Sequence, residues 1–140
     1  MRQILLFAAL AASLALLSGC ALSRAKEDTA EDMPDKAAYH KISAEESYEM
    51  MASQEVVVVD VRTREEYDGG HIENAVLVPN ESIDSEMPEA LPDKEATLLV
   101  YCRSGRRSKE ASEKLLKLGY KSIYEFGGII DWPYELVKEG

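Results

Sequence analysis

Apolar and polar positions along residues 39–140 form two kinds of pattern that alternate. Short continuous apolar runs rich in β-branched side chains are typical of strands buried on both faces, and residues 56–61, which begin with four valines, are the clearest case. Between these runs lie segments that carry helix-start signals or an amphipathic period. The pattern predicts strands at residues 39–42, 56–61, 75–78, 97–101 and 122–126.

The segments between the predicted strands have sequence patterns typical of helices. Ser43 and Thr63 each begin a Ser/Thr-x-x-Glu capping box, which predicts helices to about residue 51 and to the glycine pair at 69–70. Gly127 and Gly128 are expected to turn the chain out of the last strand. Strands that alternate with helices predict an α/β fold with a parallel sheet and right-handed crossovers. Further helices are expected at residues 82–86, at 108–118, and after Asp131, with Pro133 in the first turn.

Residues 1–20 have the features of an export signal. Arg2 precedes an apolar run over residues 4–17 that is short for a membrane span. The run ends in Leu-Ser-Gly-Cys20, which resembles the lipobox of bacterial lipoproteins, so we expect Cys20 to be lipidated, for example with palmitate. This predicts a domain on the extracytoplasmic side, held at a bacterial membrane through its lipid anchor only. A plain secretory signal and a core helix are the alternatives.

The rest of the chain divides into a linker and one domain. Residues 21–38 are rich in Ala, Glu, Asp and Lys and have no apolar periodicity, so we expect a flexible acidic linker, with a short acidic helix as the alternative. The folded domain is expected over residues 39–140, which is enough chain for one core. We expect it to be a monomer.

The chain is acidic, with a formal net charge of −10. A nucleic-acid binder needs a basic face, so this composition argues against a nucleic-acid partner. Against this background, Arg103, Arg106 and Arg107 form a local positive cluster. They could simply solvate the start of a helix, but cations there oppose the helix dipole, which favours a functional reason for them.

Cys102 follows the predicted strand at 97–101 and precedes the predicted helix at 108–118. Free backbone N–H groups at a helix start, the helix dipole and the arginines all favour an anion there, so we expect a lowered pKa of the Cys102 thiol and a reactive thiolate. If Cys20 is lipidated, Cys102 has no disulfide partner and is a lone thiol. An inert buried cysteine is the alternative, which fits poorly with the arginines.

Ligands of parallel α/β sheets bind at the carboxyl ends of the strands. Cys102 lies at one such end, and Asp60 and Arg62 lie at another, so we expect them to meet. His71 could serve as a base for Cys102, but we favour a structural role for it. Two cysteines and two histidines without ligand spacing form no metal pattern, and there is no glycine-rich nucleotide loop, so neither a metal nor a cofactor is expected.

A series of short motifs runs along the predicted domain: Asp60-Val61-Arg62, Glu66-Tyr67-Asp68-Gly69-Gly70-His71-Ile72, Ala75 with Val78-Pro79-Asn80, residues 100–108, Leu118-Gly119-Tyr120, Phe126-Gly127-Gly128 and Trp132. Taken in order, these motifs resemble those of the single-domain rhodanese family of thiosulfate sulfurtransferases. The resemblance begins near Tyr39 and runs to the C-terminus, and it implies a central five-stranded parallel sheet flanked by helices. Two departures lie outside the cysteine loop: Glu73-Asn74 where the family often has Pro-Gly, and Leu77-Val78-Pro79 where it often has Asn-Ile-Pro.

The resemblance also implies a sulfur relay. The Cys102 thiolate takes the outer sulfur of a donor such as thiosulfate and becomes a persulfide, and an acceptor then removes that sulfur. Expected partners are a small anionic donor and a thiol or cyanide acceptor, which could be a thioredoxin-like protein. Asp60, Arg62 and Glu66 are expected to form a buried charge network that supports the site. The expected donor-binding residues are Arg103, Ser104, Gly105, Arg106 and Arg107, with Arg107 as the first choice among the arginines.

Two other functions compete with this one. Phosphatases and arsenate reductases have five residues between the cysteine and an arginine, which places that arginine where this chain has Ser108, while Arg107 comes one residue earlier. The smaller loop suits one extra sulfur atom better than phosphate. A non-catalytic rhodanese-like binding module is the second rival, and a persulfide carrier for a protein partner is an intermediate possibility. The presence of Cys102 with its arginines favours the enzyme.

Overall fold

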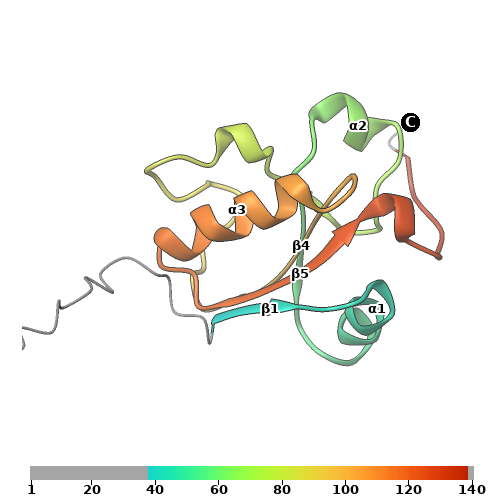
Figure 1. Ribbon diagram of the computed structural model, residues 1–140, viewed down its shortest axis with the longest axis horizontal. Coiled ribbons are helices and arrows are strands. Elements are labelled where there is room, and N and C mark those ends of the chain that lie inside the picture. The colour runs from blue at the N-terminus through green and yellow to red at the C-terminus, as the bar shows by residue number, and fades with distance from the viewer. Residues whose placement is uncertain (1–37, 139–140) are drawn as a thin grey trace, which may run out of the picture. The chain divides into compact units, whose positions relative to one another are not determined.

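The computed structural model describes residues 38–138 of the chain. Its centre is one five-stranded sheet in the order β1-β5-β4-β2-β3, in which all neighbouring strands run parallel (Figure 1). This is the predicted α/β fold, with five strands in the predicted places. The strands are β1 (Tyr39–Lys41), β2 (Val57–Asp60), β3 (Val76–Leu77), β4 (Thr97–Cys102) and β5 (Ser122–Gly128).

Three α-helices connect the strands: α1 (Ala44–Ser53), α2 (Arg64–Asp68) and α3 (Arg106–Lys117). Both capping boxes form as predicted. In the first, the Glu46 N–H donates to Ser43 Oγ at 3.1 Å and the Ser43 N–H donates to Glu46 at 2.7 Å. The second box, which begins at Thr63, opens α2 in the same way. These local hydrogen bonds satisfy N–H groups that a helix start leaves free.

The sheet is buried on both faces. One face packs against α3 through Ala111 and Leu115, and Cys102 belongs to this apolar cluster. The other face packs against α1, whose Met50 and Met51 lie on its apolar cluster. Figure 1 shows α3 and α1 on opposite sides of the sheet. The side chain of Cys102 is therefore on the α3 side.

The helix predicted over residues 82–86 is wrong. The structure has a short 3-10 helix, η2 (Asn80–Ser82), and the chain then becomes extended at Ile83, with φ −82° and ψ 109°. The Ile83 side chain is buried in the apolar cluster on the α3 side. Burial of this one side chain outweighs the weak helix preference of the polar residues around it.

The end of the chain also differs from the prediction. No helix follows Asp131: a 3-10 helix, η3 (Ile129–Asp131), leads into extended chain, since the residue before Pro133 is steered away from helical backbone. Val137 then forms an antiparallel bridge with His71. Gly127 and Gly128 do not turn out of the last strand but belong to β5, where Gly128 pairs with Cys102 after a register shift.

The predictions for the N-terminal part fall outside the described residues. They are the signal over residues 1–20, lipidation of Cys20, and the linker over residues 21–38 except for Ala38. Within the described range, 38–138, no helix combines the length and the apolar character that crossing a membrane requires.

Candidate functional site

Cys102 is the last residue of β4, and only three residues separate it from the first turn of α3. Its thiol is free and buried. The backbone N–H of Gly105 donates to Cys102 Sγ at 3.0 Å. A strand that ends one loop before a helix start therefore places the sulfur in front of free N–H groups, which is an arrangement that binds anions.

Several groups act on the pKa of Cys102. Burial raises this pKa, but the hydrogen bond between Cys102 and the Ser108 side chain, together with hydrogen bonds from the backbone N–H groups of Ser108, Gly105 and Ser104, lowers it by more, so the net shift is downward. The sequence pointed to the arginines as part of the cause. The structure instead assigns most of the lowering to neutral hydrogen-bond donors of the loop, which favour the thiolate.

Two glycines make this loop possible for different reasons. Gly105 has φ +105°, a backbone conformation that side-chain-bearing residues rarely adopt. Gly128 has an ordinary φ of −127°, but a Cβ atom there would lie 2.1 Å from the Arg103 carbonyl oxygen and 2.5 Å from Ser104 Cα. Gly128 is thus required by space: the cysteine loop rests directly on the β5 backbone.

The three arginines have different surroundings. Arg107, the first choice for donor binding, donates through both terminal nitrogens to Glu66, at 2.7 and 2.8 Å. Arg106 is exposed and pairs with Glu110 on its own helix at 3.5 Å. The side chain of Arg103 has no hydrogen-bond or ion-pair partner within residues 38–138, and it lines a cavity of about 330 Å³ beside the loop. Of the three arginines, Arg103 is therefore the one whose charge is not paired within the described range.

The predicted supporting network is split in two. Asp60 and Arg62 form a buried ion pair, with Arg62 Nη2 at 2.6 Å and Nε at 3.0 Å from the carboxylate oxygens. The Tyr101 hydroxyl donates to Asp60 at 2.6 Å. Glu66 does not join this network. It pairs with Arg107, and the hydrogen bonds from Arg107 hold the pKa of Glu66 at about 2.

His71 is buried, and its side chain contacts Tyr67. Its Nδ1 lies 2.9 Å from the Tyr67 carbonyl oxygen, and its ring stacks on the Tyr67 ring at 3.6 Å between centroids. Its backbone exchanges two hydrogen bonds with Val137. This geometry fits the structural role that the sequence favoured.

Sequence reasoning missed Glu125, a buried carboxylate in β5 beneath the cysteine loop. Glu125 accepts a hydrogen bond of 2.6 Å from Ser108, whose Oγ lies 3.5 Å from Cys102 Sγ. The alternation of side chains along a strand could have revealed it. Residues two apart on a strand share a face, and Ile123 is a core residue, so the sequence predicts that the Glu125 side chain also points into the protein. A charge at a core position of a strand needs a partner or a function.

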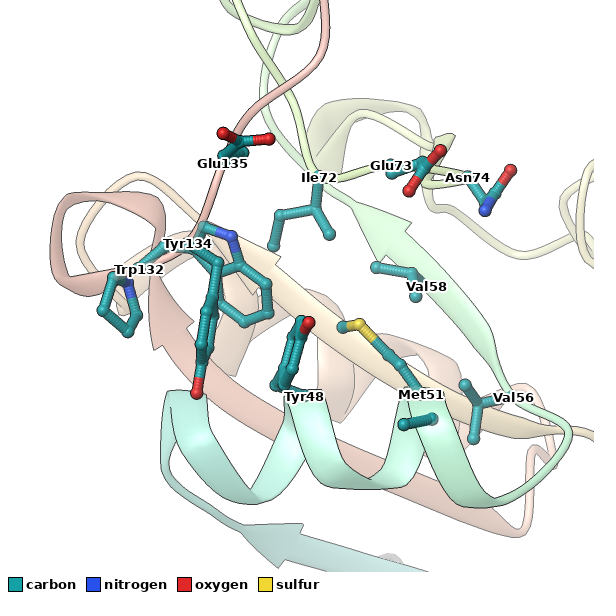
Figure 2. Close-up of a pocket in the computed structure, with 12 residues that line it drawn as sticks. Tyr48, Met51, Val56, Val58, Ile72, Glu73, Asn74, Trp132, Tyr134 and Glu135 are labelled. Atoms are coloured by element: carbon teal, nitrogen blue, oxygen red, sulfur yellow. The ribbon is translucent and has the colours of Figure 1, made fainter.

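A larger cavity, of about 900 Å³, lies on the opposite face of the sheet, beside α1 (Figure 2). Tyr48, Met51, Ile72 and Trp132 line it, and Cys102 does not. The indole N–H of Trp132 is buried there and has no hydrogen-bond partner among the residues that the structure describes. Trp132 otherwise packs on the apolar cluster of this face. Across residues 38–138, no cluster of three His, Cys, Asp or Glu side chains is arranged to hold a metal ion.

Comparison with known proteins agrees with this architecture. Residues 43–133 match the model of the Rhodanese-like domain. A rhodanese from E. coli has 34% sequence identity and a TM-score of 0.55, over 61% of this chain and 100% of that one. A rhodanese-related protein from Thermoplasma volcanium has 30% identity and a TM-score of 0.62, over 72% of this chain and 100% of that one.

Among curated proteins, the chain is similar to the tRNA uridine(34) hydroxylase of Yersinia pestis, with 33% identity over 106 residues. The match covers 72% of this chain but only 30% of the hydroxylase, so this chain corresponds to a minor part of that protein. The match to the family model covers well over half of this chain, including the cysteine loop and its supporting residues. The chain belongs to the family of rhodanese-like domains.

Proposed function

We propose that this protein is a sulfurtransferase that carries sulfane sulfur as a persulfide on Cys102. The observation that carries the proposal is the short contact of 3.0 Å between the Gly105 N–H and the sulfur of a buried, free cysteine. A thiolate or persulfide anion at this point would be stabilised by preorganised dipoles that need no rearrangement. The lowered pKa of Cys102 supports the same conclusion.

The reaction has two displacement steps. Cys102 Sγ attacks the outer sulfur of a donor such as thiosulfate, a new S–S bond forms, and the donor's own S–S bond breaks as sulfite leaves with the electron pair. A nucleophilic acceptor, either cyanide or a thiol, then attacks the outer sulfur of the persulfide. The persulfide bond breaks and its electron pair returns to Sγ.

The cation available for an anionic donor is Arg103. Arg107 is already neutralised by Glu66, whereas the Arg103 side chain lies on the cavity beside the loop with no partner in the described range. The E. coli relative was solved as a "rhodanese with anions", which is in keeping with anion binding in the family. The hydroxylase relatives offer an alternative on tRNA, but the net charge of −10 does not favour a nucleic-acid substrate.

Intact mass spectrometry after incubation with thiosulfate tests the proposal. A gain of one sulfur atom that is absent in Cys102→Ser and removed by cyanide is the expected result. No gain, with Cys102 shown to be reduced and accessible to alkylation, would reject thiosulfate as donor and favour the binding-module function. Retention of sulfur with slow turnover would favour a carrier for a protein partner.

A further inference from the structure

Beneath the cysteine loop, Cys102, Ser108 and Glu125 form a continuous hydrogen-bonded chain. The Cys102 thiol donates to Ser108 Oγ at 3.5 Å, and Ser108 Oγ donates to Glu125 Oε1 at 2.6 Å. Ser108 has one hydroxyl proton, and its other acceptors, the Gly105 and Gly127 carbonyl oxygens, are more distant, at 3.0 and 3.3 Å. The proton therefore points to Glu125, and a lone pair is left for the thiol.

We propose that this chain is a proton relay in which Glu125 receives the Cys102 proton through Ser108 during sulfur transfer. Glu125 is a positioning residue in this scheme, since it acts on the sulfur only through Ser108. The inference rests on the proposed function and adds to it the destination of the thiol proton.

The other acidic groups and the histidine near the site are poor acceptors. Glu66 is held as a carboxylate by Arg107, which keeps its pKa at about 2. If Asp60 took up a proton, it would leave Arg62, which is 5% exposed, as a buried cation without its partner. The ring of His71 is engaged with Tyr67.

Glu125 differs from these groups in the kind of cation that balances it. Its carboxylate is 1% exposed, and Lys41 pairs with the second oxygen from the edge strand β1. The Lys41 side chain is 59% exposed, so its ammonium group can be solvated by water when Glu125 becomes neutral. The Tyr39 hydroxyl and the Gly127 N–H are the other donors to this carboxylate, at 3.2 and 2.7 Å. Protonation of Glu125 therefore leaves no buried cation unpaired.

Over one catalytic cycle, the relay returns to its starting protonation state. As Sγ bonds to the outer sulfur of the donor and sulfite leaves, the thiol proton moves to Ser108 Oγ and the Ser108 proton moves to Glu125 Oε1. When the acceptor breaks the persulfide bond and the electron pair returns to Sγ, the proton returns along the same path. No proton has to cross the buried loop to bulk water in either step.

The pH dependence of Cys102 reactivity tests the relay. In the wild type, the rate of persulfide formation with thiosulfate should change little across neutral pH, because the relay removes the proton from Cys102 as the new S–S bond forms. In Glu125→Gln the reaction depends on the thiolate fraction. We expect a rate roughly 10²-fold lower at neutral pH that rises about tenfold per pH unit and recovers in alkali.

Two further variants complete the design. Ser108→Ala should show the same steep profile, and the double variant should be no slower than either single variant, because the two residues act as one unit. Glu95→Gln, which removes an exposed carboxylate paired with Lys121 on the surface, should keep the wild-type profile. An equal or faster rate for Glu125→Gln, as expected if the variant only removes a negative neighbour, would overturn the relay, as would additive losses.

The same profiles are measured with iodoacetamide, which alkylates Cys102 without any sulfur transfer. If the wild type takes no sulfur from thiosulfate, the proposed function fails, while the alkylation profiles still decide the relay. If Glu125→Gln does not fold, the profile of Ser108→Ala decides it alone: a shallow profile in that variant contradicts the relay.

Discussion

Substitution of Gly128 by alanine tests the contact between β5 and the cysteine loop. The added Cβ would lie 2.1 Å from the Arg103 carbonyl oxygen, 2.6 Å from the Arg103 carbonyl carbon and 2.5 Å from Ser104 Cα. All three atoms are backbone, so no side chain can swing aside to make room. The loop must retreat by roughly 1 Å to reach a normal contact, and a displacement of about 1 Å can cost about 10²-fold in rate.

The same clash lowers stability. Forcing an extra methyl group into a packed site costs about 1–3 kcal/mol. We therefore expect Gly128→Ala to lose about that much free energy of unfolding in urea titrations, and about 10²-fold in the rate of sulfur loading followed by mass spectrometry.

Gly69→Ala is the matched control. A Cβ at Gly69 would meet the carbonyl oxygens of Glu65 and Glu66 at 3.5 Å, which is an ordinary contact, and its φ of −67° suits alanine. We expect this variant to stay within about 0.5 kcal/mol of the wild type. Wild-type stability and loading rate in Gly128→Ala would refute the claim that the loop rests on the β5 backbone.

Three further predictions follow from the charges and the thiol. Cys102→Ser should gain no sulfur from thiosulfate by intact mass, and a gain there would place the sulfur elsewhere. Arg62→Met should lose about 3–5 kcal/mol of unfolding free energy in urea, because it strands the buried Asp60 carboxylate, and a loss below about 1 kcal/mol would contradict that reasoning. Because Glu66 has its pKa lowered from 4.5 to about 2, its stabilising effect is complete above pH 4.5 and disappears as the pH falls towards 2. Glu66→Gln should thus be less stable by about 1 kcal/mol at neutral pH, with a difference that shrinks in acid, and a difference independent of pH would contradict the pairing with Arg107.

The sequence could predict the features that depend on neighbouring residues. The two capping boxes, the β-branched strands and the Cys102 loop with Gly105 all lie within short stretches, so their geometry follows from local hydrogen bonding and backbone preference. The helix expected after Asp131 is absent for a local reason, the backbone restriction on the residue before Pro133, and for a nonlocal one, the bridge between Val137 and His71. A partner so far away in the sequence cannot be seen in a local pattern.

The same limit explains the gaps in the predicted site. Arg107 and Glu66 are 41 residues apart, and Ser108 and Glu125 are 17 apart, and only the packing of α3 against its neighbours brings each pair together. The sequence therefore showed three arginines beside a cysteine, without showing that one of them is neutralised. It predicted backbone N–H donors for the thiolate, but not the hydrogen bond between Cys102 and the Ser108 side chain.

The order of the strands bears on how the chain folds. β1 pairs with β5 and with no other strand in residues 38–138, and β5 lies between β1 and β4. Among the described residues, the first strand is thus held in the sheet only by the last one. Parallel pairing between such distant segments slows folding, since the entropic cost of closing a large loop comes before the stabilising contacts form. During synthesis, the strand edges of β1 and β4 that pair with β5 remain unpaired until residues 122–128 emerge, and unpaired strand edges are prone to aggregation.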